Sequence, residues 1–259
     1  MSPKFVSARD NPLLLRLRRQ LRSPGGYRRT GQIWVEGDHL CRAALARGVP
    51  VPLAVATEAM LSPRTQSARL LAAARELVIV PPALFAGLSS LESPAAIAYV
   101  LDLPEPAPLQ PGVATLVLDG LQDAGNVGSV LRSASALGAR QVLALKGTAA
   151  LWSPKVLRAG MGAHFGLHLL EGLAPEALDA LRVPLVATSS HAAATLAQAD
   201  LPAPCAWVLG HEGQGVSPAL TARCALTVRI PQPGGEESLN VAAAAAICLY
   251  ESARRSGLQ

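Results

Sequence analysis

Aromatic residues are scarce in this chain, which has 259 residues and only three each of Phe, Tyr and Trp. Proteins that bind single-stranded nucleic acids by stacking need several aromatic rings, so no base-stacking platform is indicated. Long apolar runs are lacking as well. The ten apolar residues Val241–Tyr250 are fewer than the roughly 18 of a membrane-spanning helix, and the N-terminus has no apolar signal-peptide core. We therefore expect a soluble protein.

Cysteine is also rare. The four cysteines (Cys41, Cys205, Cys224 and Cys248) lie far apart, without a C-x-x-C pair or clustered histidines. Neither a zinc site nor a disulfide framework is indicated, and we expect buried thiols in a reducing compartment, the cytoplasm. The chain also lacks the motifs of α/β-hydrolases, P-loop proteins, zinc proteases and deaminases, and the dinucleotide fingerprint G-x-G-x-x-G.

Positive charge is concentrated at one end of the chain. Residues 1–47 carry ten Lys and Arg against three acidic residues, a balance of +7, so the remaining 212 residues carry a net charge of −2. Six arginines fall on an expected helix and the loop after it: Arg16, Arg18, Arg19, Arg22, Arg28 and Arg29. Such a cluster suits a nucleic-acid phosphate backbone, and the alternatives are a solvated helix face or an organellar presequence.

Proline divides the chain into two expected domains. Four prolines between residues 103 and 112 predict an extended linker over 104–112, between a domain at 1–103 and a second at 113–259. In the first domain, short apolar strands alternate with helical segments, including one near 63–75, as in a small α/β domain. The alternation resumes after the linker and predicts a largely parallel sheet covered on both faces.

Ligands of parallel α/β sheets gather at the carboxyl ends of the strands, so the loops there are the candidate sites. The first such loop precedes an expected helix from about Val127 to Leu137, with Asn126 as its N-cap. Arg132 falls outside the apolar stripe of that helix and can present its guanidinium to a phosphate. The alternative is that Asn126 is a plain cap and Arg132 a surface charge.

Two further loops follow strands near the C-terminus. In the first, Glu212 stands among glycines, where it can bind a cationic group or brace a neighbouring loop. In the second, Ser238 is the expected N-cap of an apolar helix, and Ser238 and Asn240 lie where a helix start can hold an anion. The alternative for this segment is a capped core helix. His191 and His211 lie near strand ends, and we expect a structural role for each.

The three loops match three motifs in order and spacing. Asn126–Arg132 reads N-x-G-x-x-x-R, Leu209–Gly215 reads L-G-x-E-x-x-G, and Ile230–Val241 reads I-P-x-x-G followed by S-L-N-V. Together they resemble the signature of the SpoU/TrmH-type RNA ribose 2′-O-methyltransferases of the SPOUT superfamily. The stretch Val35–His39, V-E-G-x-H, and the basic helix before it are similar to the substrate-binding domain of ribosomal-RNA members.

The resemblance implies a deep trefoil knot, bound S-adenosylmethionine and a homodimer formed through the C-terminal domain. It implies cofactor contacts at Thr188, Gly210, Ile230 and Leu239. The residues that match the family's functional polar positions are Asn126, Arg132, Glu212, Ser238 and Asn240.

The implied reaction is attack of a ribose 2′-oxygen of structured RNA on the sulfonium methyl, an in-line displacement that needs alignment and removal of the hydroxyl proton. Because an arginine stays protonated, we expect Arg132 to stabilise the developing alkoxide rather than to act as an ordinary base. Ribosomal RNA is favoured over transfer RNA, because a separate basic domain suits a structured RNA. The alternatives are a tRNA 2′-O-methyltransferase, a base methyltransferase, and a non-catalytic RNA-binding or ribosome-assembly protein with the same fold.

Overall fold

The computed structural model describes residues 2–62, 68–234 and 238–257. The chain forms two compact units, one made of residues 1–105 and 152–165, the other of 106–151 and 166–259. Segment 152–165 thus packs with the first unit although it lies within the sequence of the second. None of the helices in the described ranges is long and apolar enough to cross a membrane.

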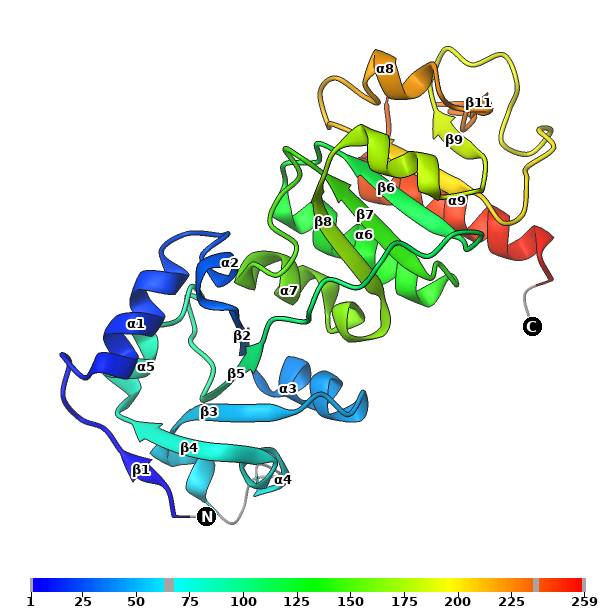
Figure 1. Cartoon of the computed structure of the whole chain (residues 1–259). Helices are drawn as coiled ribbons and strands as arrows, with labels where there is room; N and C mark the ends of the chain where they lie inside the picture. The colour runs from blue at the N-terminus through cyan, green and yellow to red at the C-terminus, as the bar shows by residue number, and fades with distance from the viewer. Residues whose placement is uncertain (1, 63–67, 235–237, 258–259) are drawn as a thin grey trace. The chain divides into compact units, whose positions relative to one another are not determined.

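The first unit is a small α/β fold (Figure 1), as the alternating pattern predicts. Its strands form one mixed sheet in the order β1-β4-β3-β5-β2, in which β5 runs antiparallel to β2 and β3. The elements are β1 (Lys4–Phe5), α1 (Pro12–Leu21), α2 (Tyr27–Thr30), β2 (Gln32–Glu36), α3 (Asp38–Ala46), β3 (Val51–Thr57), the 3₁₀ helix η1 (Glu58–Leu61), α4 (Ala68–Ala72), β4 (Ala74–Val80), α5 (Pro82–Ala86), β5 (Ile97–Asp102) and α7 (Pro154–Gly160).

Two differences from the sequence-based expectation concern this unit. Arg28 and Arg29 lie in the short helix α2 and not in a loop, because the chain turns at Gly26 into a further helical turn. Of the helix expected near 63–75, residues 68–72 form α4 and 74–75 already belong to β4, while 63–67 lie outside the described residues. The pattern also did not predict β1, α2 or α5, which are only two to five residues long.

The core of the first unit lies between its sheet and helices α1 and α5. Leu14 and Leu17 of α1 and Phe85 of α5 are buried against Trp34 and Val100 of the sheet. The apolar residues of α1 recur at helical spacing, so its other face carries the arginines. The fold therefore leaves one side of the basic helix to solvent.

The second unit contains a six-stranded parallel sheet in the order β11-β9-β10-β6-β7-β8. Its elements are β6 (Thr115–Asp119), α6 (Ala124–Ala136), β7 (Gln141–Leu145), β8 (His168–Leu173), the 3₁₀ helix η3 (Pro175–Ala180), β9 (Leu185–Thr188), β10 (Ala206–Gly210), α8 (Pro218–Thr221), β11 (Leu226–Val228) and α9 (Val241–Arg255). The predicted parallel sheet is confirmed, although the sequence pattern did not indicate the half-buried strand β8.

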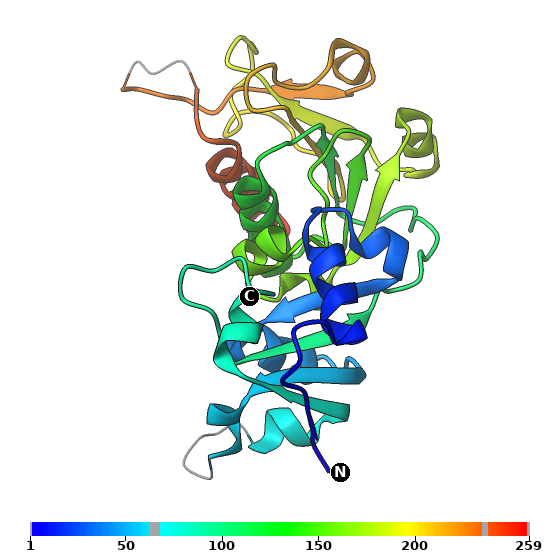
Figure 2. The ribbon, with the colours of Figure 1, turned by 90° about the vertical axis from the view of Figure 1, so that its left-hand side faces the viewer.

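Helices cover both faces of this sheet, as predicted. Helices α6 and α9 pack side by side on one face (Figures 1 and 2). On the other face, Leu178 of η3 and Leu220 of α8 are buried against Val117, Leu143 and Val208 of the strands. The sheet is therefore a rigid base whose strand ends carry the loops.

The starts of α6 and α9 differ from the prediction. The N-cap of α6 is Asp123, whose carboxylate accepts the backbone N–H of Asn126 at 2.8 Å, so Asn126 lies inside the first turn. The N-cap of α9 is Asn240, whose side-chain oxygen accepts the N–H groups of Ala242 and Ala243. Ser238 lies two residues before that cap. In each case the side chain that reaches the open N–H groups, not residue type alone, sets the helix start.

The V-E-G-x-H stretch contains a buried carboxylate with a structural role. Glu36 is only 4% exposed, and it accepts hydrogen bonds from Trp34 Nε1 at 3.2 Å, Ser89 Oγ at 2.6 Å and the backbone N–H of Ala95 at 3.2 Å. The next residue, Gly37, has φ +99°, which favours glycine. Glu36 thus joins β2 to the loop before β5.

We expect Glu36→Ala to lower the free energy of unfolding of the first unit by about 3 kcal/mol, because it leaves buried donors without an acceptor. Hydrogen exchange of the β2 and β5 amides, measured by mass spectrometry, reports this unit separately. The control is Glu92→Ala, which removes an exposed carboxylate of the same unit. Equal exchange in the two variants would contradict the structural role of Glu36.

Candidate functional site

The strands that carry the three motifs, β6, β10 and β11, end at the same edge of the parallel sheet, with β9 between β10 and β11. In the register, Gly210 at the end of β10 is paired with Asp119 at the end of β6, and Val228 of β11 with Thr188 of β9. Between β6 and β10 the strand order reverses, since β7 and β8 follow on one side of β6 and the later strands lie on the other. Parallel α/β proteins bind ligands at such a switch point.

Glu212 joins the second motif loop to the first. Its carboxylate accepts the backbone N–H groups of Gln122 at 3.2 Å and Asp123 at 3.1 Å, and the side-chain N–H of Asn126 at 3.1 Å. Burial raises the pKa of the Glu212 carboxyl, but the hydrogen bonds from Asn126 and the backbone outweigh it, so its pKa lies below the ordinary value. Glu212 is therefore an ionised brace for the loop before α6.

Asn126 and Asn240 extend this connection to the third motif. The side-chain nitrogen of Asn240 donates to the side-chain oxygen of Asn126 at 3.0 Å, while the oxygen of Asn240 caps α9. Glu212, Asn126 and Asn240 thus form one hydrogen-bonded chain, called here the Glu–Asn–Asn chain. It links three loops that are far apart in sequence.

The glycines of the second motif allow its loop to fold back on the strand end. A Cβ atom at Gly210 would overlap the backbone of Gly215 and Val216. Gly215, at φ +72°, donates its N–H to the carbonyl of His211 at 2.8 Å. His211 Nδ1 accepts the N–H of Gly213 at 3.0 Å. The structure thus gives His211 a bonding role within the loop and places Gly210 beneath it.

A cavity of about 150 Å³ lies at the carboxyl end of the sheet, at the start of the helix that Asn240 caps. Its lining residues come from the loops after β9 and β11 and from the start of α9: Thr188, Ser189, Ser190, Ile230, Gln232, Ser238, Leu239 and Ala244. Four of the residues predicted from the motifs, Thr188, Ile230, Ser238 and Leu239, are therefore together here, whereas Gly210 is not among the lining residues.

The sequence prediction did not include Gln232, which also lines this cavity. It occupies an unspecified position of the pattern I-P-x-x-G, so the motif itself gave no signal for it. Its signal is structural: the side-chain oxygen is buried and has no hydrogen-bond partner within the described part of the chain.

Arg132 lies apart from the Glu–Asn–Asn chain. It is exposed on α6, opposite the buried stripe of Val127, Val130 and Leu131, as its position in the sequence predicts. Over the ranges that the structure describes, it forms no hydrogen bond or ion pair. Its guanidinium is accordingly available to an anionic ligand.

The basic cluster of the first unit divides into two kinds of arginine. Arg18 is half-buried, donates to the carbonyl of Arg9 at 2.7 Å and lies against Gly87 at the end of α5, so it holds the fold together. The other five are exposed. The guanidinium carbon of Arg28 lies over the ring of Tyr27, 5.4 Å from the ring centroid. The exposed members are Arg16, Arg19, Arg22, Arg28 and Arg29.

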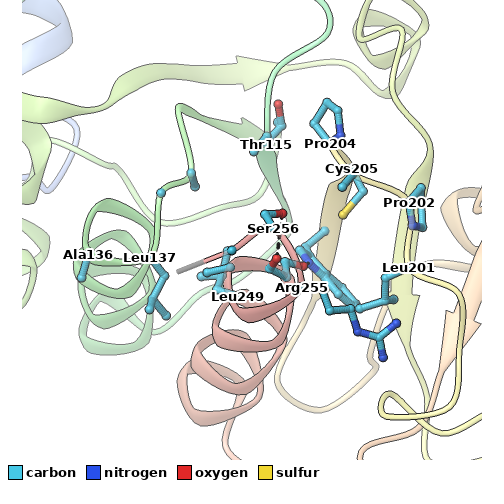
Figure 3. A pocket seen from close by; sticks show the side chains of 18 residues that line it. Thr115, Ala136, Leu137, Leu201, Pro202, Pro204, Cys205, Leu249, Arg255 and Ser256 are labelled. Carbon is cyan, nitrogen blue, oxygen red and sulfur yellow. Dashed lines mark hydrogen bonds between the residues drawn. The ribbon is translucent and has the colours of Figure 1, made fainter. Parts of the chain in front are cut away.

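A larger cavity, of about 360 Å³, opens at the other end of the same sheet (Figure 3), where Thr115 and Cys205 mark the starts of β6 and β10. None of the predicted site residues lines it. Its polar groups bond to the protein itself: Ser252 Oγ accepts from Trp207 Nε1 at 2.9 Å, and Arg255 donates to Glu251 and to the carbonyl of Leu196. The predicted site residues therefore gather at the smaller cavity and not at this one.

Comparisons with known proteins agree with this geometry. The model of the SpoU rRNA Methylase family matches residues 114–250. An uncharacterized tRNA/rRNA methyltransferase from Synechocystis is 33% identical over 257 residues, which cover 96% of this chain and 93% of that protein. RlmP from Bacillus subtilis, a 23S rRNA (guanosine(2553)-2′-O)-methyltransferase, is 30% identical over 225 residues, 86% of this chain and 88% of that protein.

The fold is shared along nearly the whole chain. The crystal structure of the SpoU methyltransferase AviRb from Streptomyces viridochromogenes, in complex with the cofactor AdoMet, has a TM-score of 0.85 and 28% sequence identity. The match covers 95% of this chain and 98% of that one. The chain therefore belongs to the SpoU rRNA methylase family, as its three motifs predict.

Proposed function

We propose that this protein transfers a methyl group from S-adenosylmethionine to a ribose 2′-hydroxyl of structured RNA, and that this RNA is ribosomal RNA. The observation that carries the proposal is the Glu–Asn–Asn chain, which joins the three family motifs at the carboxyl end of the sheet, where the loops after β9 and β11 line a cavity. RlmP, whose match covers 86% of this chain, is named for 23S rRNA, which supports ribosomal RNA over transfer RNA.

The residues around the cavity fit S-adenosylmethionine. Ile230 and Leu239 supply apolar walls, and Thr188 and Ser238 supply hydroxyl groups that donate or accept hydrogen bonds. Gly210 keeps the neighbouring loop tight against the strand end, where a side chain would block it. When bound, the cofactor supplies a methyl group already activated for transfer by the positive sulfur.

The polar residues of the motifs have distinct roles in this proposal. Arg132 contacts the phosphate of the target nucleotide and stabilises negative charge as the ribose 2′-oxygen loses its proton. Ser238 and Asn240 hold that phosphate or order the cofactor loop, and Glu212 braces the first motif through Asn126. The transfer forms an O–C bond and breaks the S–C bond, and the hydroxyl proton leaves through the phosphate beside Arg132.

The N-terminal part of the chain binds the RNA. We assign residues 1–103 to an RNA substrate-binding domain, 104–112 to a linker and 113–259 to the methyltransferase domain. The five exposed arginines on and after α1 form a basic surface that suits a phosphate backbone. RNA thus contacts one unit through charge, while the other unit carries the chemistry.

The C-terminal helix supports a homodimer. Ala243, Ile247 and Tyr250 are exposed at i, i+4 and i+7 on α9, with Ile247 at 39% and Tyr250 at 54% exposure. Exposed Leu239 lies one turn before them. An apolar stripe of this kind is typical of an interface. The family resemblance further supports a trefoil knot in the C-terminal loops, one of the rare exceptions to unknotted folds.

The cysteines support a cytoplasmic location. All four are free, and Cys41, Cys205 and Cys248 are buried as predicted, while Cys224 is half-buried. Burial raises the pKa of Cys205 to about 11 and that of Cys248 to about 12, so these thiols stay protonated.

We expect Arg132→Ala to lower the single-turnover rate of RNA methylation by roughly 100-fold, the cost of losing one charge-stabilising donor. Asn126→Ala should also lower this rate, because it breaks the Glu–Asn–Asn chain. Rapid quenching with labelled S-adenosylmethionine measures the rate, and isothermal titration measures cofactor affinity. Affinity should stay within about threefold for Arg132→Ala, since Arg132 does not line the cavity.

The matched control is Arg140→Ala, which removes an exposed arginine after the other end of α6. A near-normal rate in Arg132→Ala would refute its assignment. Failure of the well-folded wild-type protein to bind S-adenosylmethionine would instead favour a non-catalytic RNA-binding protein.

Replacing Arg16, Arg19 and Arg22 together by Ala should weaken binding to a ribosomal-RNA fragment and flatten its salt dependence. Each lost phosphate contact should reduce the slope of log affinity against log salt by about 0.7 to 0.9. Filter binding between 50 and 200 mM salt, about the range over which such contacts weaken, measures the slope. The control is Arg75→Ala, which removes an exposed arginine of β4. An unchanged slope in the triple variant would contradict the assignment of these arginines to RNA binding.

The double variant Ile247→Asp, Tyr250→Asp should convert the dimer to a folded monomer, because two buried unpaired carboxylates oppose association. Sedimentation equilibrium measures the mass. Leu15→Asp, at an equally exposed leucine of α1, should leave the dimer intact. A wild-type monomer, or a dimer that survives both changes, would rule out the α9 interface.

A further inference from the structure

The larger cavity of the second unit has the volume of a ligand site, although the predicted site residues lie elsewhere. At about 360 Å³ it falls within the range of roughly 300 to 1,000 Å³ that small-molecule sites occupy. Close-packed protein interiors contain few voids larger than a water molecule. The cavity is surrounded by the ends of α6 and α9, the starts of β6 and β10, and residues 201–204. The chemistry of these surroundings indicates what it can hold.

Apolar side chains with accessible surface form much of the cavity wall. Leu137 at the end of α6, and Leu201 and Pro202 before β10, line the cavity and are half-buried rather than fully enclosed. In Figure 3, Leu137 and Leu249 lie on one side of the hollow, and Leu201 and Pro202 lie on the other. The cavity thus presents apolar surface from two sides, as small-molecule sites do.

The charge at the cavity wall is already neutralised within the protein. Among the described residues that line the cavity, Arg255 alone is charged. All three nitrogens of its guanidinium donate hydrogen bonds to protein acceptors, which are the carboxylate of Glu251 and the carbonyls of Leu196, Ala197 and Ala199. Burial raises the pKa of the Cys205 thiol to about 11, so this lining group is neutral. An ionised ligand would lose its hydration in such a site at a large cost in free energy.

The hydroxyl groups at the wall are paired as well. Thr115 Oγ1 donates to the carbonyl of Val113 at 2.8 Å, and Ser252 Oγ accepts from Trp207 Nε1 at 2.9 Å. Ser256 lies on the exposed rim, where its hydroxyl donates to the carbonyl of Ser252 at 3.0 Å. A hydroxyl that donates can still accept a hydrogen bond. The lining therefore suits an apolar molecule with a single N–H or O–H donor directed to the rim.

We propose that this cavity, called here the amino-end cavity, binds a small, uncharged and mainly apolar molecule. The site is separate from the motif loops, and it does not depend on the proposed function. Residues 201–204 end the long loop between β9 and β10, and the first residues of that loop, Ser189 and Ser190, line the smaller cavity. A ligand in the amino-end cavity thus contacts a loop that also reaches the smaller cavity.

The test uses a matched pair of fluorescent probes. N-phenyl-1-naphthylamine is uncharged, carries a single N–H donor, and fluoresces more strongly in apolar surroundings. Its partner, 8-anilino-1-naphthalenesulfonate, has the same ring system and a negative sulfonate. Titration of the wild-type full chain should show saturable binding of the uncharged probe. The sulfonate should bind about tenfold more weakly or less, because the site encloses its charge without compensation.

Two substitutions place a ring in the amino-end cavity from different helices. Ala136 at the end of α6 and Ala253 on α9 line the cavity, and neither is buried. Ala136→Phe and Ala253→Phe should each weaken binding of the uncharged probe by about tenfold or more, because the added ring occupies the space that the probe needs. The matched control, Ser190→Phe, adds the same ring at the smaller cavity and should leave this affinity unchanged.

Thermal unfolding provides a second measurement and checks that the variants fold. Without probe, Ala136→Phe should melt near the wild-type temperature, because the substitution is at an exposed position. The uncharged probe at saturation should raise the melting temperature of the wild-type protein, since a ligand that binds only the folded state stabilises it. The same rise should occur in Ser190→Phe and should be absent in the two variants of the amino-end cavity.

The outcomes decide the proposal without reference to methyl transfer. Saturable binding that weakens with the sulfonate and with both substitutions in the amino-end cavity supports it. A wild-type protein that does not bind the uncharged probe, or that binds the two probes equally, overturns it. Binding that survives both Ala136→Phe and Ala253→Phe, or that is lost in Ser190→Phe, places the probe elsewhere and also overturns it.

Discussion

The ionised carboxylate of Glu212 is the interaction on which the site depends. It gathers two backbone N–H groups and the Asn126 amide around one negative charge, and Asn126 in turn receives the Asn240 amide. A charged acceptor forms stronger hydrogen bonds than a neutral one, so a single side chain can fix a loop that has no regular structure. The start of α6 and the start of α9 are thereby linked by side-chain hydrogen bonds.

The two cavities of the second unit differ in their position relative to the motif loops. The larger one lies at the amino ends of the strands and is surrounded by polar groups that are already paired. The smaller one lies at the carboxyl ends, where the predicted residues Thr188, Ile230 and Leu239 meet. The position of a cavity relative to the motif loops is therefore more informative about the cofactor site than its volume.

Much of the fold follows from local patterns. Short apolar strands alternating with amphipathic helices predict a covered parallel sheet, and the order of the three motifs predicts the family. The helix starts were less predictable, because Asp123 and Asn126, or Ser238 and Asn240, are all acceptable capping residues by type. Which one accepts the first N–H groups depends on the backbone path of the loop, which is set by contacts such as those of Glu212.

The sequence by itself determined the family, the candidate polar residues and the basic N-terminal surface, because these depend on residue type and spacing. The tertiary structure decided their roles. It pairs Asn126 with Glu212 and Asn240, 86 and 114 positions away, and it gives Arg18 a packing role against the end of α5. Such roles depend on long-range contacts that exist only when the parallel strands are in register, and no local pattern records that register.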